Sequence, residues 1–232
     1  MLREAKLDDI VGFENISCLF SRVFGDFILS ERLNFSDGAQ FLTDGKDLLL
    51  EIKNGSFVKI GEPSDVEEFE SFLEFVAPQS IMSESECGEI IVMKRRAVGE
   101  LKNIEINLDF KLKNFHRLFN DNGLESDKEG FMLGMSDAVK TGTGFLLGKY
   151  EEEKLVGGLC VTGITDKTAI VTAVAVEKSK RQEGIGSFLV NEACEMLSGR
   201  DVYIYREIDK NKAFYEGLGF VGVGSVKTEV LY

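Results

Sequence analysis

The chain contains few of the residues that build metal centres and disulfide frameworks. Its 232 residues include one histidine, two prolines and four cysteines. Cys18, Cys87, Cys160 and Cys194 form no close pair and show no metal-like spacing. We therefore expect no metal site and no disulfide framework, and we expect Cys160 and Cys194 to be small core residues.

Positive charge and long apolar stretches are also scarce. The 27 Lys and Arg residues against 40 Asp and Glu give a formal charge of −13, whereas nucleic acids and anionic membranes bind clustered Lys and Arg. The N-terminal segment MLREAKLDDI lacks a continuous apolar stretch, and no segment reaches the roughly 18 apolar residues of a membrane span. These absences predict a soluble cytoplasmic protein with neither nucleic acid nor membrane as a partner. The acidic surface can attract cationic amines or simply be solvated.

The composition is otherwise that of an ordinary globular protein. Hydrophobic residues make up 44% of the chain and charged residues 29%, which is enough for folded cores and argues against disorder. The length suits one large domain or two small ones. The sequence leaves open whether two chains pair as a homodimer.

The most informative segment runs from Thr168 to Leu189. An apolar, β-branched run ends at Val174-Ala175-Val176, a polar connection follows, and Gly184-Ile185-Gly186 begins a segment with helical apolar spacing. Amides at a helix N-terminus are unpaired and carry partial positive charge. Glycine leaves room for a phosphate to approach the backbone, and Arg181 adds a fixed cation. The segment therefore predicts a site for a phosphorylated ligand.

Two motifs in this part of the chain resemble those of one enzyme family. Arg181-Gln182-Glu183-Gly184-Ile185-Gly186 resembles the Arg/Gln-x-x-Gly-x-Gly/Ala turn of the GNAT superfamily of N-acetyltransferases. The segment from Asn211 to Phe220 resembles the second GNAT signature, in which an aromatic residue and a tyrosine, here Phe214-Tyr215, precede Gly-Phe. One short glycine pattern is weak support because such patterns recur by chance. Two in the right order, with strand-like Asp201–Tyr205 between them, are a specific signal.

The order of predicted elements from about Leu112 onward also resembles that family. The resemblance implies an α/β fold with a mixed sheet, the acyl-CoA N-acyltransferase fold, over residues 111–232. The predicted helices are Asn114–Asn120, Asp127–Lys140, Gly186–Leu197 and Ala213–Gly217; the predicted strands are Gly144–Tyr150, Leu155–Gly163, Thr168–Val176, Asp201–Tyr205 and a final strand pair in Phe220–Tyr232.

The first half, residues 1–110, repeats a thinner version of this order. Its predicted elements are a helix at Phe20–Leu33, strands at Ala39–Leu42, Asp47–Ile52 and Phe57–Ile60 with a hairpin turn at Asn54-Gly55, a helix opened by a capping box at Ser64–Glu67, and strands at Ser80–Ser83 and Glu89–Lys94. Alternating Ile104, Ile106 and Leu108 could form a strand of either half. The sequence resembles bacterial tandem acetyltransferases with a degenerate N-terminal half.

The degenerate half carries Gly61-Glu62-Pro63-Ser64-Asp65 where the phosphate turn would lie. Proline removes an amide that a phosphate would need, and the carboxylates repel it. We therefore expect this half not to bind coenzyme A.

The resemblance implies a set of site residues in the C-terminal half. Acetyl-CoA would be the co-substrate and a primary amine of a small molecule or protein the acceptor. The backbone of the strand before the turn would pair with pantetheine, the turn would hold the pyrophosphate, and Tyr215 would protonate the departing thiolate. The implied coenzyme-binding residues are Val174, Ala175, Val176, Arg181, Gln182, Glu183, Gly184, Ile185, Gly186, Ser187 and Asn211.

The sequence departs from the family pattern at two places. The asparagine that often lies seven residues before the tyrosine is replaced by Ile208, which puts the role of Asn211 in question. The strand glutamate that serves some members as the general base is absent, and Thr172 and Ala173 stand there instead. Glu207 could act through water or be an ordinary surface carboxylate.

Other interpretations remain open for some of these residues. His116 could be a base or a packed histidine, and Tyr215 could be only an aromatic packing residue. The protein could accordingly be a non-catalytic acyl-CoA-binding regulatory module. A dinucleotide-binding fingerprint at Gly184–Leu189 is disfavoured, because polar residues Glu177–Glu183 separate it from the end of the strand.

Overall fold

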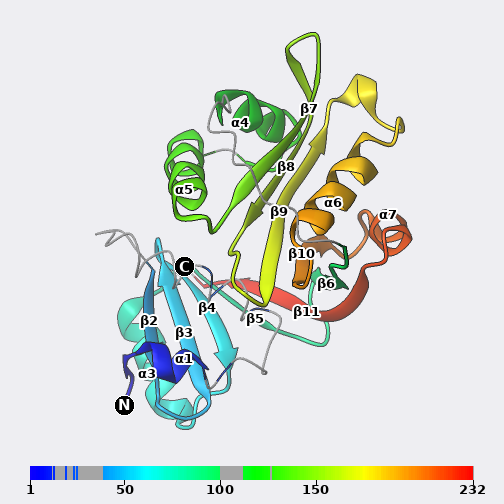
Figure 1. Ribbon diagram of the computed structural model, residues 1–232. Helices are drawn as coiled ribbons and strands as arrows, with labels where there is room; N and C mark the ends of the chain where they lie inside the picture. Colours follow the sequence, from blue (N-terminus) through cyan, green and yellow to red (C-terminus); the bar gives the residue numbers. More distant parts are fainter. Residues whose placement is uncertain are drawn as a thin grey trace. The chain divides into compact units, whose positions relative to one another are not determined.

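The computed structural model describes residues 1–11, 13, 19, 23, 25, 39–99, 112–125 and 127–231. The described chain divides into two compact units (Figure 1). Unit 1 comprises Met1–Val92, Arg206–Lys210 and Gly222–Tyr232, and unit 2 comprises Met93–Tyr205 and Asn211–Val221. The expected domain boundary at residues 110 and 111, the expected strand at 104–108 and most of the expected helix at 20–33 lie outside the described residues.

Unit 1 is built on strands in the order β1-β2-β3-β4-β5-β11. Its elements are β1 (Arg3–Glu4), α1 (Leu7–Val11), β2 (Gln40–Thr43), β3 (Leu48–Lys53), β4 (Ser56–Gly61), α3 (Val66–Val76), β5 (Ser80–Glu84) and β11 (Val221–Val230). The pairs are antiparallel except for β4 and β5, which run parallel and are connected through α3. The predicted hairpin turn between β3 and β4 is confirmed, with Asn54 and Gly55 both at positive φ.

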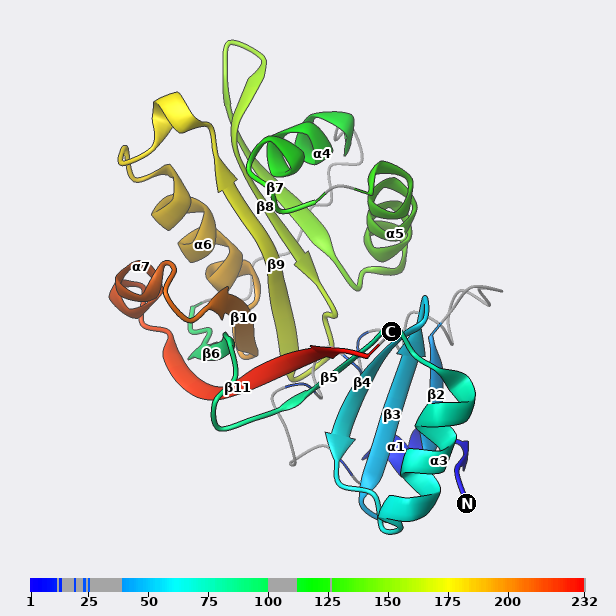
Figure 2. The ribbon, with the colours of Figure 1, turned by 180° about the vertical axis from the view of Figure 1, so that it is seen from behind.

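Helix α3 covers the unit 1 sheet (Figure 2). Phe69 on α3 packs into a buried cluster with Leu48, Phe57 and other strand residues. The predicted capping box is wrong by one residue, because Asp65 is the N-cap and its carboxylate accepts from the Glu68 amide. Ser64 instead donates its own amide to another carboxylate, Asp44, at 2.9 Å.

Unit 2 carries strands in the order β6-β10-β9-β8-β7. Its elements are α4 (Leu112–Asp121), α5 (Lys128–Thr141), β7 (Phe145–Glu151), β8 (Lys154–Thr162), β9 (Thr168–Val176), the 3₁₀ turn η1 (Lys178–Lys180), α6 (Ile185–Met196), β10 (Asp201–Glu207) and α7 (Lys212–Gly217), with β6 (Ile90–Arg96) starting in unit 1. Strands β7, β8 and β9 are antiparallel, whereas β9 and β10 are parallel. The predicted mixed sheet and its order of elements up to α7 are confirmed.

The expected final strand pair in Phe220–Tyr232 is wrong. The segment forms the single strand β11, which pairs with β5 from Val226 to Val230. Neither Gly222 nor Gly224 adopts a positive φ, so the backbone stays extended where a strand pair would need a turn. In unit 2, β6 lies beside β10, and Lys94 and Arg96 both form ion pairs with Asp201.

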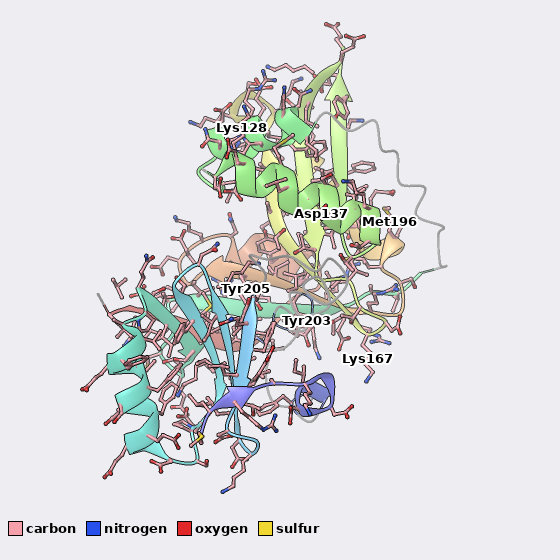
Figure 3. All side chains as sticks on the ribbon, turned by 90° about the vertical axis from the view of Figure 1, so that its left-hand side faces the viewer. Lys128, Asp137, Lys167, Met196, Tyr203 and Tyr205 are labelled. Atoms are coloured by element: carbon pink, nitrogen blue, oxygen red, sulfur yellow. The ribbon has the colours of Figure 1, made fainter. Side chains whose placement is uncertain are left out.

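Helices cover both faces of the unit 2 sheet. Figure 1 shows α4 and α5 on one side of β7–β9 and α6 on the other, and Figure 3 labels Lys128 and Asp137 along α5. Two adjacent glycines of β8 allow this close packing. A Cβ on Gly158 would lie 3.1 Å from the Phe115 ring of α4, and one on Gly157 would lie 2.5 Å from Ile185. Because Ile185 begins α6, Gly157 sets how closely the start of that helix approaches the strands.

Candidate functional site

The last residues of β9 have one free edge. A bulge at Thr172 shifts the register with β8, since Cys160 pairs with Ala173 and Val161 with Val171. The parallel register with β10 runs from Thr168 to Val171. Past the bulge, β9 continues to Val176 paired with β8 and, among the described strands, with no partner on its other edge.

Val174 and Val176 present their backbone groups on that free edge. The Glu177 amide donates to the Val156 carbonyl of β8 at 2.9 Å. Along an antiparallel strand, the N–H and C=O groups of successive residues point alternately toward one neighbouring strand and away from it. The backbone groups of Ala175, two residues before Glu177, therefore point to β8, while those of Val174 and Val176 point away from it. The amides and carbonyls of these two valines are therefore placed to pair with an extended ligand.

A tight turn connects β9 to α6. Gln182 and Gly184 have positive φ of 68° and 80°, and Gly184 is the N-cap of α6 without a side-chain cap. The first amides of a helix have no carbonyl partner within it. Those of Ile185, Gly186 and Ser187 are therefore available to a ligand at the positive end of the helix dipole.

The neighbouring cations Lys180 and Arg181 of this connection are held differently. Lys180 pairs with Glu151 at 2.8 Å and with Glu183 at 3.8 Å, and the hydrogen bond to Glu151 raises its pKa. Arg181 instead donates from Nη2 to Oδ1 of Asn122 at 2.6 Å and from Nε to the Val176 carbonyl at 3.4 Å. The guanidinium thus bridges the end of β9 and the residue that follows α4.

Helix α7 brings Tyr215 to the same region. A Cβ on Gly186 would lie 3.4 Å from the Phe214 ring and 3.7 Å from Cγ2 of Val176, so α7 packs over the start of α6. Tyr215 follows Phe214 and is only 9% exposed. It packs edge-on against Phe214 and Phe220. Burial raises the pKa of its phenol, so the hydroxyl remains protonated at neutral pH.

The arrangement of β9, the glycine turn and α6 agrees with a family model. The model of the acetyltransferase (GNAT) domain matches residues 143–222. This region is a GNAT domain. It contains β7, β8, β9, α6, β10 and α7, and so includes every predicted site residue.

Solved structures extend the likeness to the rest of the chain. A GCN5-related N-acetyltransferase from Sphaerobacter thermophilus is 13% identical with a TM-score of 0.59, over 100% of this chain and 95% of that one. A tandem GNAT protein from the clavulanic acid biosynthesis pathway is 12% identical with a TM-score of 0.58, over 100% and 99%. A GCN5-related N-acetyltransferase from Kribbella flavida is 13% identical with a TM-score of 0.57, over 90% and 93%. No curated protein matches the sequence. The likeness establishes a tandem GNAT fold.

The remaining predicted residues occupy less central places. Asn211 is exposed in the left-handed region just before α7, where its carbonyl accepts from the Tyr215 amide. Glu207 is exposed and pairs with Lys210. His116 is buried against Phe131, and among the described residues its Nε2 has no hydrogen-bond partner.

Sequence reasoning missed two features of the candidate site. Asn122, which holds Arg181, lies 59 residues before it on another element, and no motif marks it. The bulge at Thr172 depends on pairing with β8, which the apolar pattern of β9 does not reveal. Thr172 itself donates to the Cys160 carbonyl at 3.4 Å.

The Cys160 thiol is buried, which raises its pKa to about 12, so it remains protonated.

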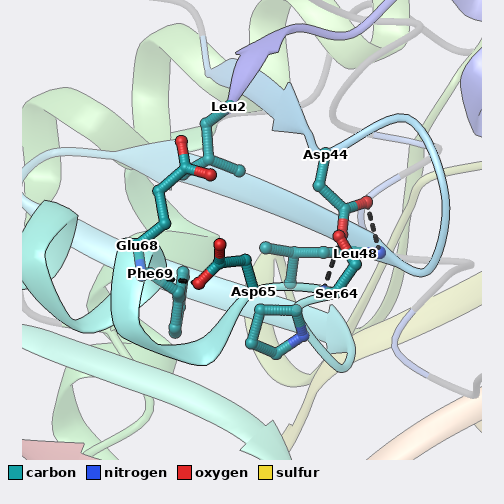
Figure 4. Close-up of a pocket in the computed structure, with 8 residues that line it drawn as sticks. Leu2, Asp44, Leu48, Ser64, Asp65, Glu68 and Phe69 are labelled. Atoms are coloured by element: carbon teal, nitrogen blue, oxygen red, sulfur yellow. Dashed lines mark hydrogen bonds between the residues drawn. The ribbon is translucent and has the colours of Figure 1, made fainter.

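The equivalent turn of unit 1 already holds a carboxylate (Figure 4). Asp44 accepts from the amides of Lys46, Asp47 and Leu48 through Oδ1 and from that of Ser64 through Oδ2. Burial by itself would raise the pKa of this carboxyl, but the backbone donors, with Ser64 foremost, lower it below its ordinary value. The Asp44 carboxylate thus accepts from an amide beside the start of α3. In a copy of the fold that binds coenzyme A, a phosphate of the ligand would bind at this place.

We expect Asp44→Asn to destabilise the protein by about 1–2 kcal/mol at neutral pH, because charged acceptors bind amides more strongly than neutral ones. The folded-state pKa is lowered, so the stabilisation is present above the ordinary pKa of about 3.9 and is lost as pH falls below it. Urea unfolding should therefore separate wild type and variant at pH 7 and bring them together in acid. Asp47→Asn, which changes an exposed neighbour, is the control, and an equal effect there would contradict the assignment.

Two further findings concern the described part of the chain. It contains no group of three or more His, Cys, Asp or Glu side chains placed to hold a metal ion. Among its helices, none has both the length and the apolar character needed to cross a bilayer.

Proposed function

We propose that the protein is an N-acetyltransferase that moves an acetyl group from acetyl-CoA to a primary amine. One observation carries the proposal: the free edge of β9 leads directly to the unpaired amides at the start of α6, with Tyr215 packed beside them through Phe214. This continuous path matches a ligand with an extended amide chain at one end and a pyrophosphate at the other.

The residues present fit acetyl-CoA. Val174 and Val176 can pair with the pantetheine amides as an added strand would, and Gly186 leaves space that a larger side chain would fill. The amides of Ile185 to Ser187 and the guanidinium of Arg181 can hold the phosphates. The pairing is assigned to the two valines, because the Ala175 backbone is directed to β8.

Acetyl transfer requires bond formation at carbon and protonation at sulfur. The neutral amine attacks the carbonyl carbon, and an amide along the free edge of β9 stabilises the oxyanion that develops. The C–S bond then breaks, and the Tyr215 hydroxyl donates its proton to the departing thiolate. The nitrogen loses its extra proton to water, and the tyrosinate recovers one, so charge and atoms balance over the cycle. The raised pKa of Tyr215 keeps this donor protonated between turnovers.

We assign catalysis to residues 111–232 and a structural or acceptor-shaping role to residues 1–110. The acceptor would be an amine of a small molecule or protein. Its protonated form is attracted by a chain with a net charge of −13.

A second candidate is a non-catalytic acyl-CoA-binding module. It is favoured by one observation: Thr172 and Ala173 occupy the strand positions where some family members carry a glutamate base. Such a module would use the same coenzyme site without turnover.

Thiol release over a panel of primary amines tests the two candidates. We expect continuous release of coenzyme A, well beyond one equivalent per chain, with at least one amine and acetyl-CoA. Gly186→Glu is the control for release that does not involve the site. Coenzyme binding without turnover across small-molecule and peptide amines would favour the binding module.

A further inference from the structure

The guanidinium of Arg181 is held by a neutral partner. Its Nη2 donates to Oδ1 of Asn122 at 2.6 Å. Among the described residues Arg181 forms no ion pair, whereas its neighbour Lys180 is paired with two carboxylates. An amide acceptor orients a guanidinium without neutralising it. Arg181 therefore retains its full charge for a ligand, unlike Lys180 beside it.

Asn122 is itself held in place. Its Nδ2 donates to the Leu118 carbonyl at 2.8 Å, and its backbone amide donates to the Phe119 carbonyl at 3.1 Å. It therefore closes the C-terminal end of α4. That helix is anchored on the sheet, where Leu118 and Phe115 pack over Gly158. The position of Asn122 is thus set by the packed core of unit 2 and not by the exposed turn.

We propose that Asn122 is a positioning residue that aims Arg181, with its charge unpaired, at the phosphates of the coenzyme. The inference rests on the proposed function, because it needs a phosphorylated acyl donor at this turn. Two of the five N–H groups of Arg181 are used by Asn122 and Val176, and the others can donate to phosphate oxygens. Without Asn122, this exposed side chain must lose more conformational freedom when the coenzyme binds.

Two substitutions separate orientation from charge. Asn122→Ala removes both side-chain hydrogen bonds, and we expect the dissociation constant for coenzyme A to rise about 3–10-fold. Asn122→Asp also loses the bond to Leu118 but places a carboxylate opposite Arg181. We expect this variant to weaken coenzyme binding about 10–100-fold, because the new carboxylate competes with the phosphates for Arg181 and repels them. The difference between the two variants measures the charge effect, and it should shrink at high salt.

A substrate without phosphates distinguishes positioning of Arg181 from a merely structural role of Asn122, because structural damage would lower kcat/KM for both substrates. The kcat/KM for acetyl-CoA should fall in both variants, while that for S-acetylpantetheine, which lacks phosphates, should stay within about twofold of wild type. In an Arg181→Ala background, Asn122→Ala should add no further loss. Asn191→Ala is the matched control, since Asn191 accepts from Arg95 at 2.8 Å in the same unit.

The outcomes separate this inference from the function on which it rests. Failure of the wild type to bind coenzyme A in calorimetry would overturn both. If Arg181→Ala weakens binding but the Asn122 variants do not, only the positioning role is wrong. Equal losses with acetyl-CoA and S-acetylpantetheine would also overturn it, since they would indicate general damage to unit 2.

Discussion

Gly186→Glu is expected to abolish coenzyme binding while leaving the fold intact. Gly186 lies in the first turn of α6, where a new Cβ would meet Phe214 at 3.4 Å and Val176 at 3.7 Å. A Cβ alone fits as an ordinary contact. The rest of a glutamate side chain would add bulk and a negative charge at the helix end that is proposed to hold the pyrophosphate. Calorimetry should give one equivalent of acetyl-CoA per wild-type chain and none for the variant.

Gly186→Ala is the matched control for Gly186→Glu. It adds only the Cβ and should retain binding, since alanine also suits a helix better than glycine. We expect one coenzyme per chain because unit 1 should bind none. There the Ser64 amide already donates to Asp44, and Pro63 has no amide hydrogen. Two equivalents per chain, or affinity that survives Gly186→Glu, would show that the coenzyme binds elsewhere.

Tyr215→Phe should lower kcat by about 10²–10⁴-fold with little change in coenzyme affinity, the range expected for loss of a general acid. The substitution keeps the ring that packs against Phe214 and Phe220 and removes only the hydroxyl. Because burial raises the pKa of that hydroxyl, wild type should retain its proton donor throughout the neutral range. Steady-state kinetics and calorimetry on both proteins test the two parts of the expectation.

The choice of leaving group provides a control for Tyr215→Phe. An acetyl thioester of a more acidic thiol needs less help in departing, so the variant should lose less activity with it than with acetyl-CoA. Near-normal turnover of acetyl-CoA by the variant would contradict the role, and Tyr215 would then serve packing alone.

Most elements of the C-terminal half could be predicted because their signals are local. The apolar, β-branched run of Thr168–Val176 predicted β9 with its bounds unchanged, and the glycines after it marked the start of α6 within one residue. The final strand pair failed for a non-local reason. Whether a glycine-containing segment turns or stays extended depends on the strand it pairs with, and β11 pairs with β5, which lies far earlier in the chain.

The candidate site divides in the same way. The turn from Arg181 to Gly186 could be recognised because its chemistry resides in consecutive backbone amides. The sequence could not show which of Val174, Ala175 and Val176 direct their backbone groups to the free edge. That depends on which residues of β9 form hydrogen bonds with β8. The capping of α3 was misplaced by one residue. Asp65 accepts from the Glu68 amide, while the Ser64 amide donates to Asp44, which belongs to a different loop.

Local sequence was enough to predict the order of elements up to α7, the turn of unit 2 that is proposed to bind an anion, and the unsuitable turn of unit 1, since each depends on residues adjacent in the chain. Long-range packing instead makes β9 outrun its pairing with β10, brings Phe214 to Gly186 and places Asn122 against Arg181. These contacts join residues far apart in sequence. They exist because helices packed on both faces of one sheet bring the residue after α4 to the turn that follows β9, and bring α7 to the start of α6. No local propensity encodes these contacts.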